Sequence, residues 1–454
     1  MKRIVMLFLI LVIPTGFLSA QKLLDIYKNG PVKLVADKTY GAKNNWESLF
    51  NLYYDTITKN VGREEDKKII VAPDGSVFMS HRNRHEVWKF GPDGNYLKKF
   101  GSKGGKQEQF SVMPLIYKVF DDKYLIISGG GGPKFFDLEG NFFKSVTMDY
   151  SISDFQPLNN KEVLYEGNVM WKYDVPDSEY FTYKWRHIIV KLNIYSGEKK
   201  ILHEFFEDGD TWWHKSGNIY SSKMVPPPNN KIYLPNYMIY RRPVFTMFQD
   251  GRFMQSNRET GEVKLFNQDG KELSSFKLDI IPVTITEKDA LDNYKSKKQS
   301  LLKSISNARL VRDSIKISKG ESGTTPGTVI KAFPNSDEII KRGEVALTKI
   351  ESYKDINNYF PNLPYFSNII VDDEGNLLVF EFTSSEERQS NIFNVVAYDA
   401  NGQKLARTSF ICDDYDLSFS DSKFVISKGY VYAVAKLKNT TGMPLRLVKF
   451  KITN

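Results

Sequence analysis

Residues 89–101 read KFGPDGNYLKKFG, an apolar run, a glycine-containing turn and a second short run with two lysines. Glycines beside basic residues can indicate a phosphate loop. This stretch does not fit Gly-x-x-x-x-Gly-Lys-Ser/Thr, however, and neither does SGGGGPKF at residues 128–135. A phosphate cradle also needs backbone N–H groups at a helix N-terminus, whereas an Asp-Gly step between strand-like runs is a hairpin signal. Both stretches are therefore predicted to be turns between strands.

The turn of this stretch recurs along the chain. Weaker copies read FDLEGNFF (136–143), LNIYSGEKKIL (192–202), FNQDGKEL (266–273) and YDANGQKL (398–405). A second tight turn precedes each copy, as in Pro73-Asp74-Gly75. Glycine accepts the positive φ that such turns require, so each repeat is predicted to be a four-stranded antiparallel unit.

Six such units are predicted, at residues 68–101, 116–148, 154–206, 240–279, 365–410 and 422–452. This pattern predicts an all-β fold, a six-bladed β-propeller of four-stranded antiparallel blades. The sixth unit ends at Phe450 before its second turn, so its fourth strand is expected from residues 32–40, VKLVADKTY. Pairing the first and last segments closes the ring and hides edge strands. Seven blades, with one inside the long insertion, are the structural alternative.

Residues 69–110 resemble an NHL-type repeat. They have an apolar strand, an Asp-Gly turn, a strand, a polar loop, an aromatic strand, a second Asp-Gly turn and a closing Phe-Gly run that ends in Gln-Phe. IIVDDEGNLLVFEF, from Ile369, matches the first half again. The chain as a whole resembles the exported six-bladed β-propeller proteins of envelope-rich bacteria, many of which have no assigned activity. Ser80 stands near the place where that family usually has an aspartate, so no role of that aspartate carries over.

The first 20 residues are predicted to be a signal peptide. Lys2 and Arg3 precede an apolar run of about ten residues that is too short to span a bilayer, and cleavage is expected after Ala20. An uncleaved anchor is the alternative. Cys412 is the only cysteine, so no internal disulfide can form and no lipid-anchoring cysteine lies near the cleavage site. We expect a secreted or periplasmic protein that is not a lipoprotein, with residues 21–454 as one domain and no transmembrane segment after cleavage.

Three long segments, at residues 167–187, 207–242 and 282–364, are predicted to lie on one face of the ring, opposite the short turns. The first two are expected to be loops. The third is predicted to be partly helical, because Thr286 and Asp289 form a capping box and a second helix is expected over 336–353. SKGESGTTPG, at 318–327, is expected to be a flexible loop between the helices. The net charge of +9 is modest for 454 residues and is spread along the chain, so no nucleic-acid partner is expected.

Tryptophan and tyrosine are concentrated in the long segments. These side chains offer contact area at low entropic cost, and they stack on sugars and pack at protein interfaces. A protein or carbohydrate partner is therefore expected on this face, with packing of the aromatic residues onto the propeller body as the alternative. The predicted ligand-binding residues are Trp171, Trp185, Trp212, Trp213, His81, Arg82, Arg84, Arg241 and Arg242.

An exported hydrolase or lyase is the second functional hypothesis. The resemblance implies it, because some six-bladed propellers hold a divalent ion in the central channel. Only Glu381 and Asn257 stand at comparable places here. His81 and His85 have the i, i+4 spacing of zinc ligands on a helix, but they lie in a predicted loop. The sequence therefore predicts no catalytic or metal-binding residue and leaves the cofactor unknown.

Overall fold

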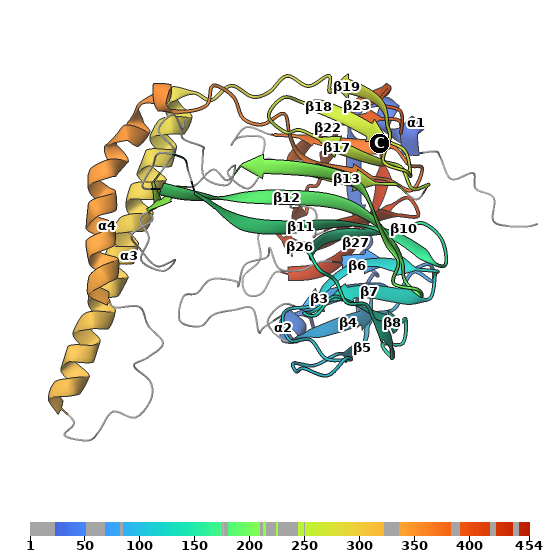
Figure 1. The fold of residues 1–454 in the computed structure, drawn as a ribbon, viewed down its shortest axis with the longest axis horizontal. Coiled ribbons are helices and arrows are strands. Elements are labelled where there is room, and N and C mark those ends of the chain that lie inside the picture. The colour runs from blue at the N-terminus through green and yellow to red at the C-terminus, as the bar shows by residue number, and fades with distance from the viewer. Residues whose placement is uncertain are drawn as a thin grey trace, which may run out of the picture.

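The computed structural model describes residues 23–50, 69–81, 85–174, 176, 180–208, 212–214, 224–225, 244–248, 250–321, 336–382, 391–417, 424–438 and 445–454. These residues form a body of β-sheets with a pair of helices, α3 and α4, standing at one side (Figure 1). None of the described helices is long and apolar enough to cross a membrane.

Three of the sheets are antiparallel and have four strands each, hydrogen-bonded in chain order. The first contains β2 (Ile69–Val71), β3 (Val77–His81), β4 (Glu86–Phe90) and β5 (Tyr96–Phe100). The second contains β6 (Leu115–Phe120), β7 (Tyr124–Ser128), β8 (Pro133–Asp137) and β9 (Phe142–Ser145). The fourth along the chain contains β16 (Val244–Met247), β17 (Phe253–Ser256), β18 (Glu262–Phe266) and β19 (Glu272–Lys277).

The third sheet along the chain is larger. Its strands are β10 (Ser151–Pro157), β11 (Glu162–Asp174), β12 (Tyr180–Asn193), β13 (Lys199–Asp208), β14 (Trp212–His214) and β15 (Met224–Val225). Both β13 and β14 pair with β12: β13 pairs with residues 184–192 and β14 with residues 180 and 181. Figure 1 shows β11 and β12 running out of the body as a long hairpin on the side where α3 and α4 lie.

The last sheet has nine strands because the beginning of the chain joins two groups of strands from its end. One group is β20 (Phe366–Val371), β21 (Leu377–Glu381), β22 (Ile392–Tyr398) and β23 (Lys404–Ile411). The other is β24 (Tyr415–Asp416), β25 (Phe424–Ser427), β26 (Tyr430–Leu437) and β27 (Leu445–Thr453). Between them lies β1 (Val32–Ala36), which is antiparallel to β27 and makes a short parallel pairing with β23. The expected pairing of residues 32–40 with the last strands is confirmed.

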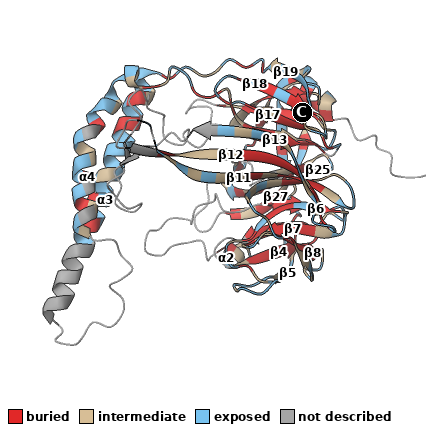
Figure 2. Cartoon of the chain, viewed as in Figure 1, coloured by how far each residue is buried: buried red, intermediate tan, exposed pale blue. Residues whose placement is uncertain are grey.

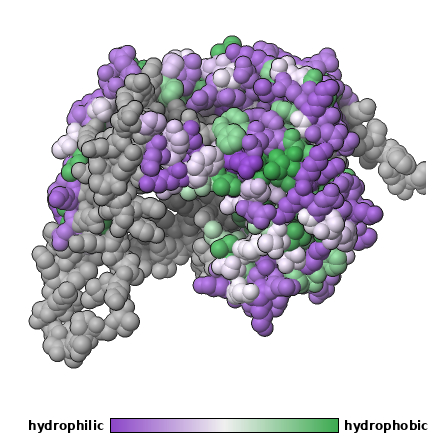
Figure 3. All heavy atoms as spheres, viewed as in Figure 1, coloured by the Kyte–Doolittle hydropathy of each residue, from purple (hydrophilic) through white to green (hydrophobic). Residues whose placement is uncertain are grey.

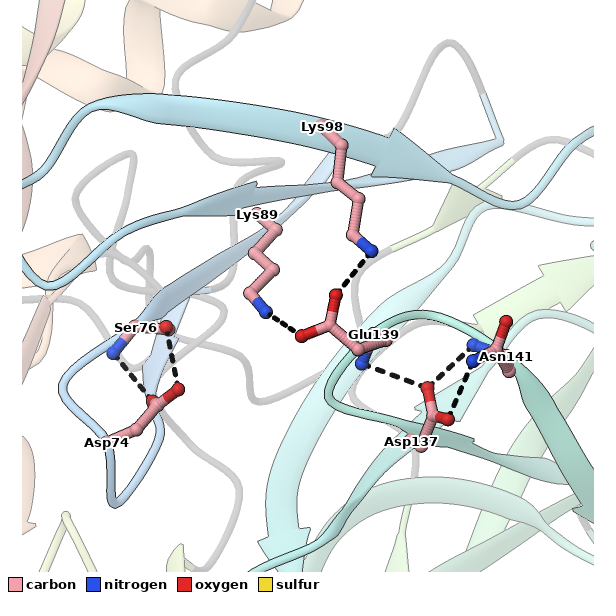
Figure 4. Close-up of polar contacts among 7 residues, drawn as sticks. All are labelled: Asp74, Ser76, Lys89, Lys98, Asp137, Glu139 and Asn141. Carbon is pink, nitrogen blue, oxygen red and sulfur yellow. Dashed lines mark hydrogen bonds and ion pairs between the residues drawn. The ribbon is translucent and has the colours of Figure 1, made fainter.

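The predicted tight turns are present among the described residues, and several begin with a side chain that accepts a backbone hydrogen bond within the turn. Asp93 accepts a hydrogen bond from the backbone N–H of Asn95 at 3.0 Å, and Gly94 has a φ of +77°. Asp74 and Asp137 do the same in their own turns (Figure 4). Short aspartate and asparagine side chains favour turns because they bind the backbone two residues on. The local sequence is therefore sufficient to place these turns.

Two of the turns between third and fourth strands also pack against the last strand of the preceding sheet. A Cβ atom at Gly140 would lie 2.5 Å from the ring of Phe100, the last residue of the first sheet. A Cβ atom at Gly402 would lie 2.3 Å from the ring of Phe276, which belongs to β19. Glycine is needed at these positions for close approach as well as for positive φ.

An ion-pair cluster joins the first and second sheets beside one of these turns (Figure 4). Glu139, in the turn between β8 and β9, binds Lys89 of β4 at 2.7 Å and Lys98 of β5 at 2.5 Å. These hydrogen bonds lower the pKa of Glu139 to about 2. The carboxylate is therefore ionised across the neutral range and links two sheets through their surface.

Apolar side chains fill the spaces between sheets. Tyr117 and Phe135 of the second sheet pack with Phe155, Tyr165 and Ile188 of the third. Figure 2 shows buried residues throughout the strands of the body, while α3 and α4 are mostly exposed. Sheet-to-sheet burial supplies the main apolar contribution to stability.

The long insertion is helical in its described residues. It contains α3 (Glu287–Glu321), α4 (Ser336–Lys349), η6 (Ile350–Lys354) and η7 (Ile356–Asn358). Thr286 and Asp289 exchange the hydrogen bonds of the predicted capping box, which is confirmed. The flexible loop predicted over 318–327 is wrong in its first residues, because α3 continues to Glu321. The described part of 282–364 contains one isolated bridge and no strand, so it provides no seventh blade.

The chain begins with two short helices that pack on the body. In α1 (Leu23–Lys28), Tyr27 is fully buried and its hydroxyl donates to Asp372 at 3.2 Å. In α2 (Trp46–Phe50), Trp46 stacks on Phe90 of β4, with ring centroids 6.1 Å apart. The segments on both sides of β1 are thus held by the first and last sheets.

Candidate binding surface

The hairpin of β11 and β12 is longer than its counterparts in the other sheets. The strands β11 and β12 have 13 and 14 residues, whereas β3 and β7 have five each. Their pairing continues without a break from Glu162↔Asn193 to Asp174↔Phe181. The loop predicted over residues 167–187 is therefore wrong, because most of it is strand. Alternating bulky and polar residues in VMWKYD and FTYKWR are the signal that could have shown this.

One face of this hairpin, together with β13, carries a group of aromatic and charged side chains. Residues paired across an antiparallel sheet share a face, and residues two apart along a strand do too. The pairs Trp171↔Lys184, Tyr173↔Thr182 and Arg186↔Phe206 therefore lie on the same face. We call this the aromatic face and define it as Trp171, Tyr173, Thr182, Lys184, Arg186, Glu204 and Phe206.

The side chains of the aromatic face contact one another in three ways. Trp171 and Phe206 meet edge to face, with centroids 6.0 Å apart and planes at 82°. Lys184 Nζ lies 3.9 Å from the centroid of the Tyr173 ring, and Arg186 Nε donates to Glu204 at 2.6 Å. Phe206 is nevertheless 55% exposed. Figure 3 shows hydrophobic residues gathered over the part of the body where β10 to β13 run, bordered by hydrophilic surface.

Trp185 lies on the opposite face of the same hairpin. It pairs with Met170 and stacks on His187, with centroids 6.5 Å apart. His187 is 3% exposed; its Nδ1 lies 3.6 Å from Glu166, and its ring contacts Phe245 of the fourth sheet. Trp185 thus belongs to the seam between the third and fourth sheets. The structure therefore separates Trp171 from Trp185, which the sequence had grouped.

The structure describes only some of the remaining predicted residues. Trp212 and Trp213 lie in β14, where Trp213 pairs with Phe181 near the tip of the hairpin. His81 is the last residue of β3 and pairs with Glu86. The other predicted residues, Arg82, Arg84, Arg241 and Arg242, lie outside the described residues. All four predicted tryptophans therefore belong to one six-stranded sheet.

Sequence reasoning missed Phe206, Lys184 and Arg186. Phe206 is the last residue of the third predicted unit, and β13 continues past it to Asp208. Phe206 lies opposite Arg186 because β12 and β13 pair in one particular register, and no local sequence pattern specifies that register.

The residues considered for channel chemistry have structural roles. Asn257 accepts backbone hydrogen bonds from Glu259 at 2.8 Å and Thr260 at 3.1 Å, which closes the turn between β17 and β18. Glu381 Oε1 lies 2.8 Å from Arg407 Nη1. Within the part of the chain that the structure describes, no three histidine, cysteine or acidic residues are grouped so that they could hold a metal ion.

Two other reactive residue types are also engaged in the fold. His85 Nδ1 lies 3.1 Å from the carbonyl of Phe110, where it joins the end of the first sheet to the linker that follows. Burial raises the pKa of Cys412 to about 11, so its thiol is protonated at neutral pH. A protonated, buried thiol is a poor nucleophile.

The sequence matches no family model and no curated protein. Solved structures similar to the chain include virginiamycin B lyase from Staphylococcus aureus, at 8% identity and a TM-score of 0.35 over 86% of this chain and 96% of that one. A gluconolactonase from Xanthomonas campestris has 10% identity and a TM-score of 0.34 over 83% and 82% of the two chains. The β-propeller domain of Cps50 (Swd1) from Myceliophteria thermophila has 9% identity and a TM-score of 0.31 over 86% and 96%. Likeness at this level says nothing about the activity of this chain.

Proposed function

We propose that the chain is a six-bladed β-propeller, formed as one domain from residue 21, whose N-terminal segment completes the last blade. Three sheets have four strands, the third sheet is built on β10 to β13, and β1 divides the nine-stranded sheet into two further groups. Gly94 supports the closure. A Cβ atom there would lie 2.6 Å from the ring of Tyr40, which follows β1. This repeats the contact between Gly140 and Phe100 at the place where the chain ends meet.

We further propose that the protein is exported and serves as a binding module for a protein or glycan, with the aromatic face as the contact surface. Export rests on the predicted signal peptide. The observation that carries the binding function is the contact of half-buried Trp171 with exposed Phe206 on strands that extend beyond the packed body. Exposed aromatic residues grouped on a rigid sheet are typical of interaction surfaces.

The charges of the aromatic face suit this function. Lys184 is held over Tyr173 and Arg186 is paired with Glu204, so polar groups border the Trp171–Phe206 pair. An apolar centre with a polar rim is the usual anatomy of a contact surface. Both aromatic rings are braced by strand pairing, so a partner would order few side chains on binding.

Substitution of the aromatic pair tests the proposal. The mature protein is applied to a glycan array and, separately, to cross-linked envelope extract, and the same is done with Trp171→Ala and Phe206→Ala. Loss of a central aromatic contact should weaken binding by about tenfold or more. Trp185→Ala is the matched control, because it removes the same side chain from the opposite face of the hairpin, where it stacks on His187, and should lower stability while leaving binding unchanged. Trp212→Ala with Trp213→Ala tests the other predicted residues.

The binding of these variants distinguishes the two faces of the hairpin. If folded Trp171→Ala and Phe206→Ala proteins bind as tightly as the parent protein, the aromatic face is not the contact surface. If Trp185→Ala alone reduces binding, the surface lies on the opposite side of the hairpin. Circular dichroism and the melting temperature show whether each variant is folded.

A further inference from the structure

A pocket of about 610 Å³ lies where the beginning of the described chain meets its end. One wall is the segment after β1, with Asp37 and Trp46. The other wall is formed by Asp413 and Asp414, which follow β23, and by Lys438 and Arg446 at the facing ends of β26 and β27. The volume is within the range of small-molecule sites, roughly 300–1,000 Å³. This pocket is separate from the aromatic face.

The acidic residues of the pocket are available to a ligand. Asp413 and Asp414 are exposed, and no hydrogen bond or ion pair from either carboxylate is found among the described residues. The hydroxyl of Thr39 donates to Asp37 at 2.7 Å and lowers the pKa of that carboxyl. The pocket therefore presents the carboxylates of Asp37, Asp413 and Asp414.

Two basic residues of the pocket, Lys438 and Arg446, donate hydrogen bonds to neutral groups of the protein. Lys438 Nζ donates to the carbonyl oxygen of Cys412 at 3.2 Å. Burial raises the pKa of Tyr415, and a hydrogen bond from Arg446 opposes that rise. Neutral acceptors leave the cationic charge in place, and a lysine has three donors and an arginine five. Both cations therefore keep donors for a carboxylate.

Tyr40 also lines the pocket, and its hydroxyl is buried. Its side chain is 7% exposed, and its hydroxyl has no hydrogen-bond partner among the described residues. Buried hydroxyl groups are nearly always paired, so an unpaired one at a pocket wall calls for a ligand or a water.

We propose that this pocket binds a small zwitterion, of amino-acid to tripeptide size, with its ammonium group at Asp413 and Asp414 and its carboxylate at Arg446 and Lys438. The pocket carries both acidic and basic side chains, which favours a ligand with both charges, because a ligand of one sign would leave the other set unpaired. Trp46 supplies an apolar wall for a side chain. The guanidinium group of Arg446 has the two-pronged geometry that suits a carboxylate.

Titration calorimetry with three forms of one peptide tests this proposal. The probes are Gly-Phe-Gly with free termini, its N-acetylated form and its C-amidated form. Each block should weaken binding to the mature protein by about tenfold or more. In Asp413→Asn with Asp414→Asn, acetylation should no longer matter; in Arg446→Gln, amidation should no longer matter. Lys438→Gln replaces Arg446→Gln if that variant does not fold.

Asp122→Asn is the matched control, because Asp122 is an exposed acid in the turn between β6 and β7, where its φ of +52° suits asparagine. It should bind all three probes as the parent protein does. Equal affinity for the three forms overturns the proposal, and so does the absence of binding to the free peptide. A loss of discrimination in the control variant would also overturn it, because net charge would then explain the result.

Discussion

Replacement of Gly94 by alanine tests whether the beginning of the chain locks the ring. Gly94 has a φ of +77°, and a new Cβ atom would lie 2.6 Å from two ring carbons of Tyr40. The Gly94 carbonyl also accepts a hydrogen bond from Asn44 at 2.8 Å, and the N–H of Gly41 donates to Asp93 at 2.8 Å. A forced shift of this turn would therefore disturb several contacts between the N-terminal segment and the first sheet.

Two costs contribute to the expected effect. An alanine in the left-handed region costs about 1–2 kcal/mol. Displacement of a packed ring adds about 1–3 kcal/mol, the usual cost of overpacking. Gly375→Ala is the control, since Gly375 has a φ of +80° and a Cβ atom there would meet nothing within 4 Å. The Gly375→Ala protein should lose only the stability that corresponds to the left-handed backbone cost.

Urea unfolding, followed by both fluorescence and circular dichroism, measures the difference. Gly94→Ala should be less stable than Gly375→Ala by about 1–3 kcal/mol, and the difference should shrink in a Tyr40→Ala background. Equal losses in the two alanine variants would refute the reasoning, because they would show that the contact with Tyr40 adds nothing. Coincident transitions by the two probes are needed for the comparison of free energies.

Three further predictions concern stability. Glu139→Gln should lower the free energy of unfolding by at most about 1 kcal/mol at pH 7, because the side chain is 61% exposed. The pKa of Glu139 is lowered to about 2 in the folded protein, so its stabilising contribution is present above the unfolded pKa and is lost as the pH falls through the folded value. Urea unfolding of both proteins at pH 7 and pH 2 would show this loss. Tyr40→Phe removes an unpaired buried hydroxyl and should raise the free energy of unfolding of the unliganded protein by about 1 kcal/mol, with a higher melting temperature as the check. Thr286→Ala removes the capping box of α3 and should cost about 1 kcal/mol locally, seen as faster hydrogen exchange in the first turn of the helix.

The sheets could be predicted because their signals are local. An aspartate two residues before the hydrogen-bonded N–H, followed by a glycine, specifies a turn wherever it occurs, and Asp93 with Gly94 shows both parts. The capping box at Thr286 is equally local, as is the helical spacing that follows it. The fourth strand of the last unit could be predicted because that unit ends before its second turn and so has one strand fewer than the others.

The surface was harder to predict because it depends on register. Trp171 and Trp185 belong to one segment of the sequence. Trp171 pairs with Lys184, the residue next to Trp185, so the two tryptophans lie on opposite faces of the hairpin. Phe206 reaches Trp171 only because β13 pairs with β12 in a particular alignment. The pocket at the chain ends required contacts between residues near 40 and residues beyond 410, which no local pattern encodes.

The position of β1 has a consequence for how the protein reaches its native state. Ala36 pairs with Phe450, so this contact closes a loop that contains nearly the whole chain. Loop-closure entropy makes the step about 3 kcal/mol more costly than closing a ten-residue hairpin. The remaining strands are therefore expected to assemble first, with β1 docking last. Until it docks, the edges of β23 and β27 stay open to other chains, so aggregation during refolding should depend on how quickly this one segment arrives.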